Sequence, residues 1–246
     1  MSYKSVFRRY ELKYLLTPSQ RDAVLAGIAP YMQLDNYGRT TIRNVYYDTD
    51  NYRLIRNSIE KPIYKEKLRM RSYGPVDGDG MVFVELKKKY DGVVYKRRLA
   101  VSESVGTDWL CGKSARPCDT QISREIDYFL SFYGSLRPSM FLSYEREAFH
   151  EREGGDFRVT FDDNIFCRST DLSLTCKPYG YSILPPDRVL MEIKCPGAIP
   201  LWMVDILSSE KIYKTSFSKY GRAYIDTVLN MPAEANHTRE EILINA

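Results

Sequence analysis

Alternating apolar and polar positions recur along most of the chain. They predict β-strands, because successive side chains on a strand point to opposite faces. The alternation begins around Phe7 and Tyr10. We expect strands over Tyr3–Leu16, Thr40–Asp48, Tyr64–Tyr73, Met81–Lys89, Val93–Val101, Pro138–Phe149, Phe157–Phe166 and Arg188–Cys195. Glycine-rich segments and the pair Asp91-Gly92 join three of these strands as hairpins, which indicates an antiparallel sheet.

Helical spacing of apolar residues separates some of the strands. Thr17-Pro18 marks one helix start, because a threonine side chain caps a helix and proline suits its first position. We expect helices from Thr17 to about Ala29, over Asp50–Ser58, near Asp108–Cys111, over Thr120–Tyr133, near Leu201–Ser208 and over Ser216–Met231. With about eight strands and no internal repeat, the pattern predicts one α+β domain over residues 1–246. Its expected architecture is an antiparallel closed β-barrel with helices packed outside.

Several strands carry charges on alternate positions. Lys65, Lys67, Arg69 and Arg71 share one face of their strand, and Leu68 lies on the other. Faces of other strands are shared by Glu85, Lys87 and Lys89, by Lys96 and Arg98, by Tyr144 and Arg146, by Arg158, Thr160 and Asp162, and by Glu192 and Lys194. For a single strand, a solvated outer face is the usual explanation. Here amphipathic helices need the apolar faces, so we expect the charged faces to line a polar lumen.

A confined surface rich in lysine and arginine needs a polyanion, because unbalanced cations repel one another. Phosphate is the best match, since arginine offers a planar fork to two oxygens and lysine a compact charge. The sparse carboxylates Glu11, Glu85 and Glu192 suggest Mg²⁺ or Mn²⁺, held by one or two carboxylates plus phosphate oxygens. The strand-face argument alone also adds these candidates: Arg43, Lys67, Arg98 and Lys194.

Composition and charge narrow the class of protein. With 43% apolar and 28% charged residues, the chain can bury a sizeable core. The net charge of +4 is too small for a general nucleic-acid coat, although a 5′-triphosphate RNA end could enter a phosphate-lined lumen. The five cysteines lack CxxC spacing, which argues against a zinc site and a disulfide framework. This cysteine pattern fits a reducing cytoplasm, so we expect a cytoplasmic protein, and we recognise no signal peptide or membrane span.

Short motifs follow one another in an order and spacing that are specific together. They are ELKY (Glu11–Tyr14), YYDT (Tyr46–Thr49), KLRMRSYG (Lys67–Gly74), VELK (Val84–Lys87), YKRR (Tyr95–Arg98), YERE (Tyr144–Glu147), RVTFD (Arg158–Asp162), MEIK (Met191–Lys194) and SFSKYGR (Ser216–Arg222). On these motifs the chain resembles the VTC domain, the catalytic domain of vacuolar transporter chaperone polyphosphate polymerases. That domain belongs to the triphosphate tunnel metalloenzyme (CYTH-like) superfamily.

The resemblance implies a metal-dependent transfer of phosphate from ATP to polyphosphate within a basic tunnel. It implies that Glu192 binds a divalent metal, Mn²⁺ or Mg²⁺. The phosphate-binding residues that it implies are Lys13, Arg69, Arg71, Lys87, Lys96, Arg146, Arg158 and Lys219. The strand faces point independently to most of these. Lys219 is selected by the resemblance alone, because it lies at the start of a predicted helix.

The chain departs from the superfamily pattern on its first strand. The triphosphatase branch has an ExExK signature there, whereas this chain has Arg9 in place of the first glutamate and keeps Glu11 and Lys13. That change favours the polymerase branch. Hydrolysis of triphosphate or nucleoside triphosphate stays open as an alternative, with Glu11 or Glu85 activating water. A module that binds polyphosphate without catalysis is the other alternative.

Overall fold

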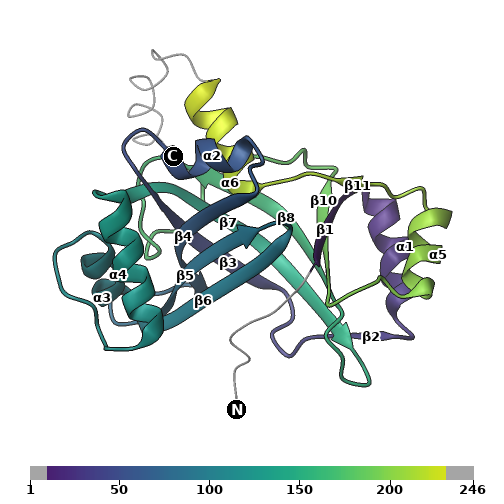
Figure 1. Ribbon diagram of the computed structural model, residues 1–246. Helices are drawn as coiled ribbons and strands as arrows, with labels where there is room; N and C mark the ends of the chain where they lie inside the picture. The colour runs from purple at the N-terminus through teal and green to yellow at the C-terminus, as the bar shows by residue number, and fades with distance from the viewer. Residues whose placement is uncertain (1–9, 231–246) are drawn as a thin grey trace.

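The computed structural model describes residues 10–230. Within them the chain forms an 11-stranded sheet flanked by helices (Figure 1), which confirms the α+β class. The strands are β1 (Tyr10–Leu16), β2 (Met32–Leu34), β3 (Thr40–Asp48), β4 (Tyr64–Tyr73), β5 (Met81–Tyr90), β6 (Val93–Ser102), β7 (Arg137–Glu151), β8 (Arg158–Arg168), β9 (Tyr181–Ser182), β10 (Val189–Cys195) and β11 (Lys214–Thr215). The helices are α1 (Pro18–Ile28), α2 (Arg53–Ile59), α3 (Glu103–Leu110), α4 (Gln121–Tyr133), α5 (Leu201–Ser209), α6 (Lys219–Tyr224) and the π-helix η1 (Ile225–Leu229). No helix in this range is long and apolar enough to cross a membrane.

Most of the predicted elements are present. β3 and β4 have the predicted bounds, and α1 follows Thr17, whose side chain accepts from the Gln20 amide in a capping box. The first predicted strand is described only from Tyr10 onwards. The helix expected over Ser216–Met231 starts later, at Lys219, and continues as η1. β2, β9 and β11 are additional, because two or three residues are too few to show an alternation.

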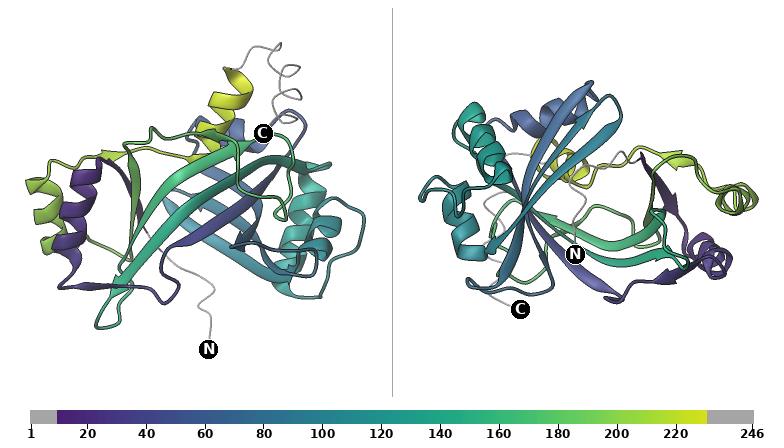
Figure 2. Two further views of the ribbon diagram at one scale, coloured as in Figure 1. Left: turned by 180° about the vertical axis from the view of Figure 1, so that it is seen from behind. Right: turned by 60° about the horizontal axis from the view of Figure 1, so that its bottom comes forward.

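The sheet is antiparallel but open, so the predicted closed barrel of about eight strands is wrong. Its order is β11-β1-β10-β8-β7-β3-β4-β5-β6, with β2 beside β7 and β9 beside β8. In the described chain β6 pairs only with β5, and β11 reaches only Lys13 and Tyr14 of β1. The two ends of the sheet are therefore not joined by strand pairing, although the sheet is strongly curved (Figure 2).

Helices cover the outward face of the sheet at both ends (Figure 1). At one end α3 and α4 bury Trp109 and Phe129 in a cluster with Leu68 of β4 and Val84 of β5. At the other end α1 and α5 pack on apolar side chains of β1, β8 and β10, where Met203 is fully buried. The alternate side chains of these strands point to the opposite side, which we call the inner face. The helices thus occupy the apolar faces, as the sequence predicts.

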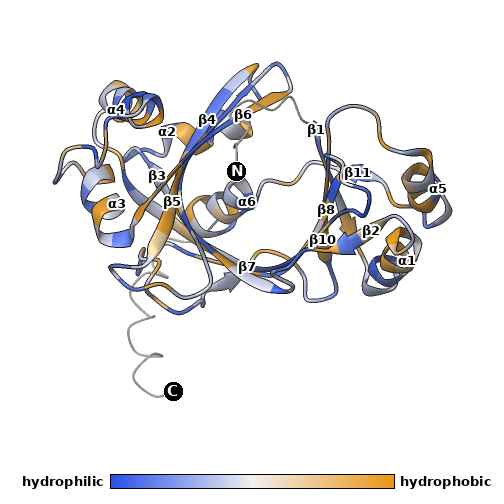
Figure 3. Cartoon of the chain, turned by 90° about the horizontal axis from the view of Figure 1, so that it is seen from below, coloured by the Kyte–Doolittle hydropathy of each residue, from blue (hydrophilic) through white to orange (hydrophobic). Residues whose placement is uncertain are grey.

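Helix α6 lies between the two ends of the curved sheet (Figure 3). Its Tyr220 ring stacks on Tyr46 of β3, with 4.5 Å between the ring centroids. The Tyr220 hydroxyl donates to Asp48 at 2.9 Å, and Asp48 also accepts from the Leu54 amide at the start of α2. These contacts fix α6 against β3. They hold Lys219, its first residue, against the inner face.

Candidate functional site

A buried carboxylate in β5 gathers cations from β4 and β6. Strand register places Glu85 opposite Arg69 on one side and Arg98 on the other. Arg69 donates to Glu85 Oε2 through Nε at 2.9 Å and Nη2 at 2.8 Å, and Arg98 Nε donates to Oε1 at 2.8 Å. Lys96 Nζ lies 2.5 Å from Oε1, and Arg71 Nε lies 3.8 Å from Oε2. Burial raises the pKa of Glu85, but these cations outweigh burial and hold it well below its usual value.

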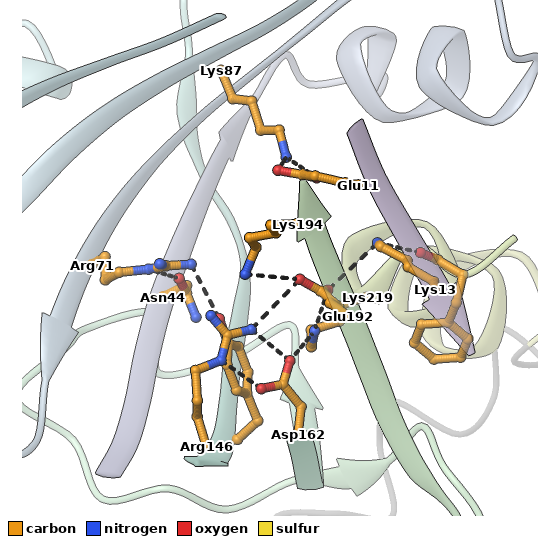
Figure 4. Close-up of polar contacts among 12 residues, drawn as sticks. Glu11, Lys13, Asn44, Arg71, Lys87, Arg146, Asp162, Glu192, Lys194 and Lys219 are labelled. Carbon is orange, nitrogen blue, oxygen red and sulfur yellow. Dashed lines mark hydrogen bonds and ion pairs between the residues drawn. The ribbon is translucent and has the colours of Figure 1, made fainter. Parts of the chain in front are cut away.

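A second group forms around two acids on β8 and β10 (Figure 4). Arg146 of β7 donates to Asp162 through Nε at 2.5 Å and Nη2 at 2.6 Å. Lys219 Nζ lies 2.5 Å from Asp162 Oδ2 and 3.1 Å from Glu192 Oε1. Burial raises the pKa of Glu192, but the cations around it, Lys219 first, hold it well below its usual value. Cations therefore surround both acids and favour their ionised forms.

Arg71 and Tyr144 connect the two groups. Arg71 donates to Asn44 Oδ1 through Nε at 2.9 Å and to the Tyr144 hydroxyl through Nη2 at 3.1 Å. The Tyr144 ring centroid lies 5.1 Å from the guanidinium carbon of Arg146 and 4.7 Å from Lys219 Nζ. Cations over an aromatic face are stabilised by its electrostatic quadrupole. The two groups thus form one continuous cationic surface.

The first strand contributes side chains that reach across this surface. Glu11 accepts from Lys87 Nζ at 2.7 and 3.0 Å, which connects β1 to β5 near the opposite end of the sheet order. Lys13 Nζ lies 3.6 Å from Glu192 Oε1 and donates to the Phe217 carbonyl at 2.5 Å (Figure 4). Side chains therefore bridge the part of the sheet that backbone pairing leaves open.

Five inner-face lysines have lowered pKa values: Lys13, Lys65, Lys67, Lys96 and Lys194. Burial is the largest cause for each, and neighbouring cations add to it. The pKa of Lys96 falls to about 7, that of Lys194 falls to about 8, and that of Lys67 falls well below its usual value. Lys67 donates to Ser218 Oγ at 3.0 Å, and Lys194 Nζ lies 3.6 Å from Glu192. An anion among these lysines favours their charged form, so the surface gains from binding phosphate.

Arg43 and Arg158 do not join the connected network. The expectation that Arg43 lies on the charged face is wrong, because strand parity places Asn44 there beside Arg71. Arg43 lies on the outer face, where its Nη1 donates to the Leu174 and Cys176 carbonyls at 3.1 Å. Arg158 has the inner-face parity of β8 but is exposed at the start of the strand. Arg9, the residue in place of the first glutamate, lies outside the described residues.

The three predicted metal-binding carboxylates, Glu11, Glu85 and Glu192, do not form a single cluster. No group of three or more His, Cys, Asp or Glu that could hold a metal occurs within residues 10–230. Cations lie 2.5–2.8 Å from both oxygens of Glu85, closer than the cations at 3.1–3.7 Å around Glu192, so Glu85 is the less available of these two carboxylates. Burial and the Glu192 charge raise the pKa of Glu11, but Lys87 lowers it to about 2. Glu11 and Glu192, on paired strands, fit a Mg²⁺ or Mn²⁺ that takes its other ligands from phosphate.

Sequence reasoning missed Asp162 and Tyr144 as site residues. Asp162 is fully buried, and the strand register places it opposite Arg146. In the sequence, Asp162 shares a strand face with Arg158. An acidic residue in such a motif does not by itself indicate a phosphate site. Tyr144 is 3% exposed and resembles a core residue by composition. Its hydroxyl accepts a hydrogen bond from Arg71, which is distant in sequence.

The chain matches one protein family and is similar in fold to several solved structures. The profile of the VTC domain family matches residues 8–227. No curated protein matches the chain. A candidate adenylate cyclase from Bacillus halodurans has a TM-score of 0.54 at 14% identity, covering 87% of this chain and 95% of that one. The candidate adenylyl cyclase HpAC1 from Hippeastrum, described as having a dominant triphosphatase activity, has a TM-score of 0.53 at 15% identity, covering 90% and 98%.

The family match spans most of the chain, and the solved structures share its fold over nearly their whole length. At these identities the structural likeness concerns the fold alone. The curved sheet, with a cationic inner face and helices on its outer face, agrees with the architecture that the motifs imply. The chain therefore belongs to the VTC domain family.

Proposed function

We propose that the protein is a metal-dependent polyphosphate polymerase that uses ATP. A terminal phosphate oxygen of the acceptor chain attacks the γ-phosphorus, the bond from that phosphorus to the β–γ bridging oxygen breaks, and ADP leaves. The acceptor then carries one more phosphate. Such a reaction needs aligned phosphates and neutralised charge more than covalent help from the protein.

The observation that carries this proposal is the state of the inner-face carboxylates. Glu11, Glu85, Asp162 and Glu192 all form ion pairs with lysine or arginine. The pKa of each is lowered because its cationic neighbours outweigh burial. Carboxylates with such low pKa values are weak general bases. A phosphate acceptor is already an anion and needs no base, whereas water must lose a proton.

The proposed roles follow from the positions of the side chains. Arg69, Arg71 and Arg146 clamp the reacting phosphates. Arg69 pairs with Glu85, Arg146 pairs with Asp162, and Arg71 connects these two groups through Tyr144. Lys87 and Lys96 guide the anionic chain along β5 and β6. The other proposed phosphate contacts are Lys13, Lys67, Arg98, Arg158, Lys194 and Lys219.

Glu192 and Glu11 are the proposed ligands of Mn²⁺ or Mg²⁺. A divalent cation held by these two carboxylates would neutralise charge on the transferred phosphate. Lys219 and Lys13 lie close to Glu192, and Lys87 pairs with Glu11.

Triphosphate hydrolysis is the second candidate. The likeness to the fold of HpAC1, with its described triphosphatase activity, favours it. Glu11 also matches the second acid of the triphosphatase signature. Hydrolysis requires Glu11 to exchange Lys87 for a water molecule. A protein that binds phosphate chains without catalysis is the remaining alternative.

Incubation with ATP and Mn²⁺ separates these functions. We expect long-chain polyphosphate and ADP from the polymerase, whereas free phosphate without polyphosphate would overturn the proposal in favour of hydrolysis. Glu192→Gln should lower turnover by about 10²–10³-fold, the usual loss for one positioned electrostatic group. Tripolyphosphate binding should persist in that variant. Glu125→Gln, on the surface of α4, is the matched control and should retain full turnover.

A further inference from the structure

A pocket of about 390 Å³ lies where the start of β4 and the end of β5 meet the segment before α6. The loop before β4 contributes Lys61, β4 contributes Lys65, and β5 contributes Lys89. The turn after β5 contributes Asp91, and the segment before α6 contributes Ser216. The pocket is thus built from five parts of the chain, three of which carry a lysine.

The lysines of this pocket lack acidic partners, unlike the cations around Glu85 and Glu192. Within residues 10–230, Lys61, Lys65 and Lys89 form no ion pair, although Asp91 also lines the pocket. Lys65 Nζ donates to the Ser58 carbonyl at 3.0 Å. Burial first, and then repulsion from Lys89 and Lys61, lower the pKa of Lys65. A concave group of unpaired ammonium groups is suited to an anion that the protein itself does not supply.

The pocket continues the cationic surface of the inner face. Lys65 has the same strand parity as Lys67 and Arg69, and Lys89 has the same parity as Lys87 and Glu85. Lys65 and Arg69 are four residues apart on β4, which is roughly 13 Å along a strand. A ligand held by the arginines around Glu85 must therefore extend along β4 to contact the pocket.

We infer that this lysine pocket is a separate phosphate subsite that holds the remote part of a polyphosphate chain. This inference rests on the proposed binding of phosphate chains by the inner face. It adds discrimination by length: a short anion occupies the arginine clusters alone, whereas a long chain also occupies the pocket. The bound chain emerges between the loop before β4 and the turn after β5.

The test compares two ligands and two matched double variants. Lys61→Ala/Lys89→Ala removes two pocket lysines, and Lys113→Ala/Lys177→Ala removes the same charge from exposed loops elsewhere. Calorimetry measures affinity for tripolyphosphate and for long-chain polyphosphate at fixed salt. The pocket variant should lose about tenfold or more in affinity for the long chain, since two charge-assisted contacts disappear. Its affinity for tripolyphosphate should change less than about twofold.

The control variant should bind both ligands as the wild type does. Lys61→Arg/Lys89→Arg, which keeps the charge, should restore long-chain affinity. Equal losses for both ligands in the pocket variant indicate general electrostatic attraction and overturn the subsite. An unchanged long-chain affinity also overturns it. If the wild type binds neither ligand, the proposed function itself fails, which is a distinguishable result.

Discussion

Glu85 shows how one buried acid can organise a cationic surface. Its side chain is 1% exposed and accepts from Arg69 and Arg98 while Lys96 lies 2.5 Å away. Removing one member of a buried ion pair leaves the others desolvated without compensation. These contacts indicate that Glu85 holds the surrounding cations in place.

We expect Glu85→Gln to lower the free energy of unfolding by about 3–5 kcal/mol, because its cationic neighbours lose their counter-charge. Urea unfolding followed by circular dichroism measures the change. Glu125→Gln breaks a more exposed pair with Arg97 and should cost less than about 1 kcal/mol. A Glu85→Gln protein as stable as the wild type would show that Glu85 is not the anchor.

Lys96 provides a pH-dependent signature of anion binding. Burial lowers its pKa to about 7, against the attraction of Glu85. Above that pH the side chain is largely neutral, and a bound phosphate restores the proton by raising the pKa. Tripolyphosphate should therefore bind with uptake of protons at pH 8, and its affinity should fall as the pH rises above about 7. Calorimetry in buffers with different ionisation enthalpies measures the uptake, which Lys96→Met should reduce and Lys113→Ala should not.

Alternation in the sequence found the charged residues of β4, β5 and β6, because a strand of known parity fixes which residues share a face. Alternation alone does not fix which face points inward, and that prediction depends on the helices, which need the apolar faces. From the sequence, Arg43 is predicted on the charged face. Its side chain instead points to the other face of β3 from that of Asn44, where it donates to loop carbonyls. Lys219 comes from a helix and follows no strand period, so only the family motif indicated it. Asp162 became visible as a site residue through its register with Arg146.

The strands themselves were predictable where they are long and their pattern is strong. β3 and β4 match their predicted bounds, and Asp91-Gly92 forms the predicted turn with both residues at positive φ. Whether the sheet closes could not be read from strand patterns, because closure depends on pairing between distant edges. β11 has only two residues, so among residues 10–230 it pairs with no more of β1 than Lys13 and Tyr14.

The Glu11–Lys87 ion pair connects two strands that backbone hydrogen bonds do not join. It joins β1 and β5, which are not neighbours in the sheet. A double-mutant cycle with Glu11→Gln and Lys87→Met should give a coupling energy of about 0.5–1 kcal/mol, because both side chains are partly exposed. Thermal or urea unfolding measures the cycle. The coupling should shrink in 1 M salt, and a coupling near zero at low salt would mean that the pair does not help to join the strands.

The molecule as a whole concentrates positive charge that its modest net charge of +4 does not reveal. Outer-face pairs such as Arg21–Glu147 and Arg97–Glu125 balance charge on the helix-covered side. On the inner face, lysines and arginines outnumber the acids that hold them. Family motifs predicted this separation of charge better than composition could, since composition averages over both faces.

The excess of inner cations means that the unliganded protein is stabilised by any ligand that neutralises them. We expect tripolyphosphate at 100 times its dissociation constant to raise the free energy of unfolding by about 2.7 kcal/mol. For a chain of this size that corresponds to a rise in Tm of roughly 5–10 °C. Sodium chloride at equal ionic strength is the control for screening and should give a smaller shift. Arg69→Gln/Arg146→Gln should need a higher tripolyphosphate concentration for the same rise, because both clusters lose their guanidinium groups. Equal shifts with chloride and tripolyphosphate would mean that the inner face responds to ionic strength and not to a bound phosphate chain.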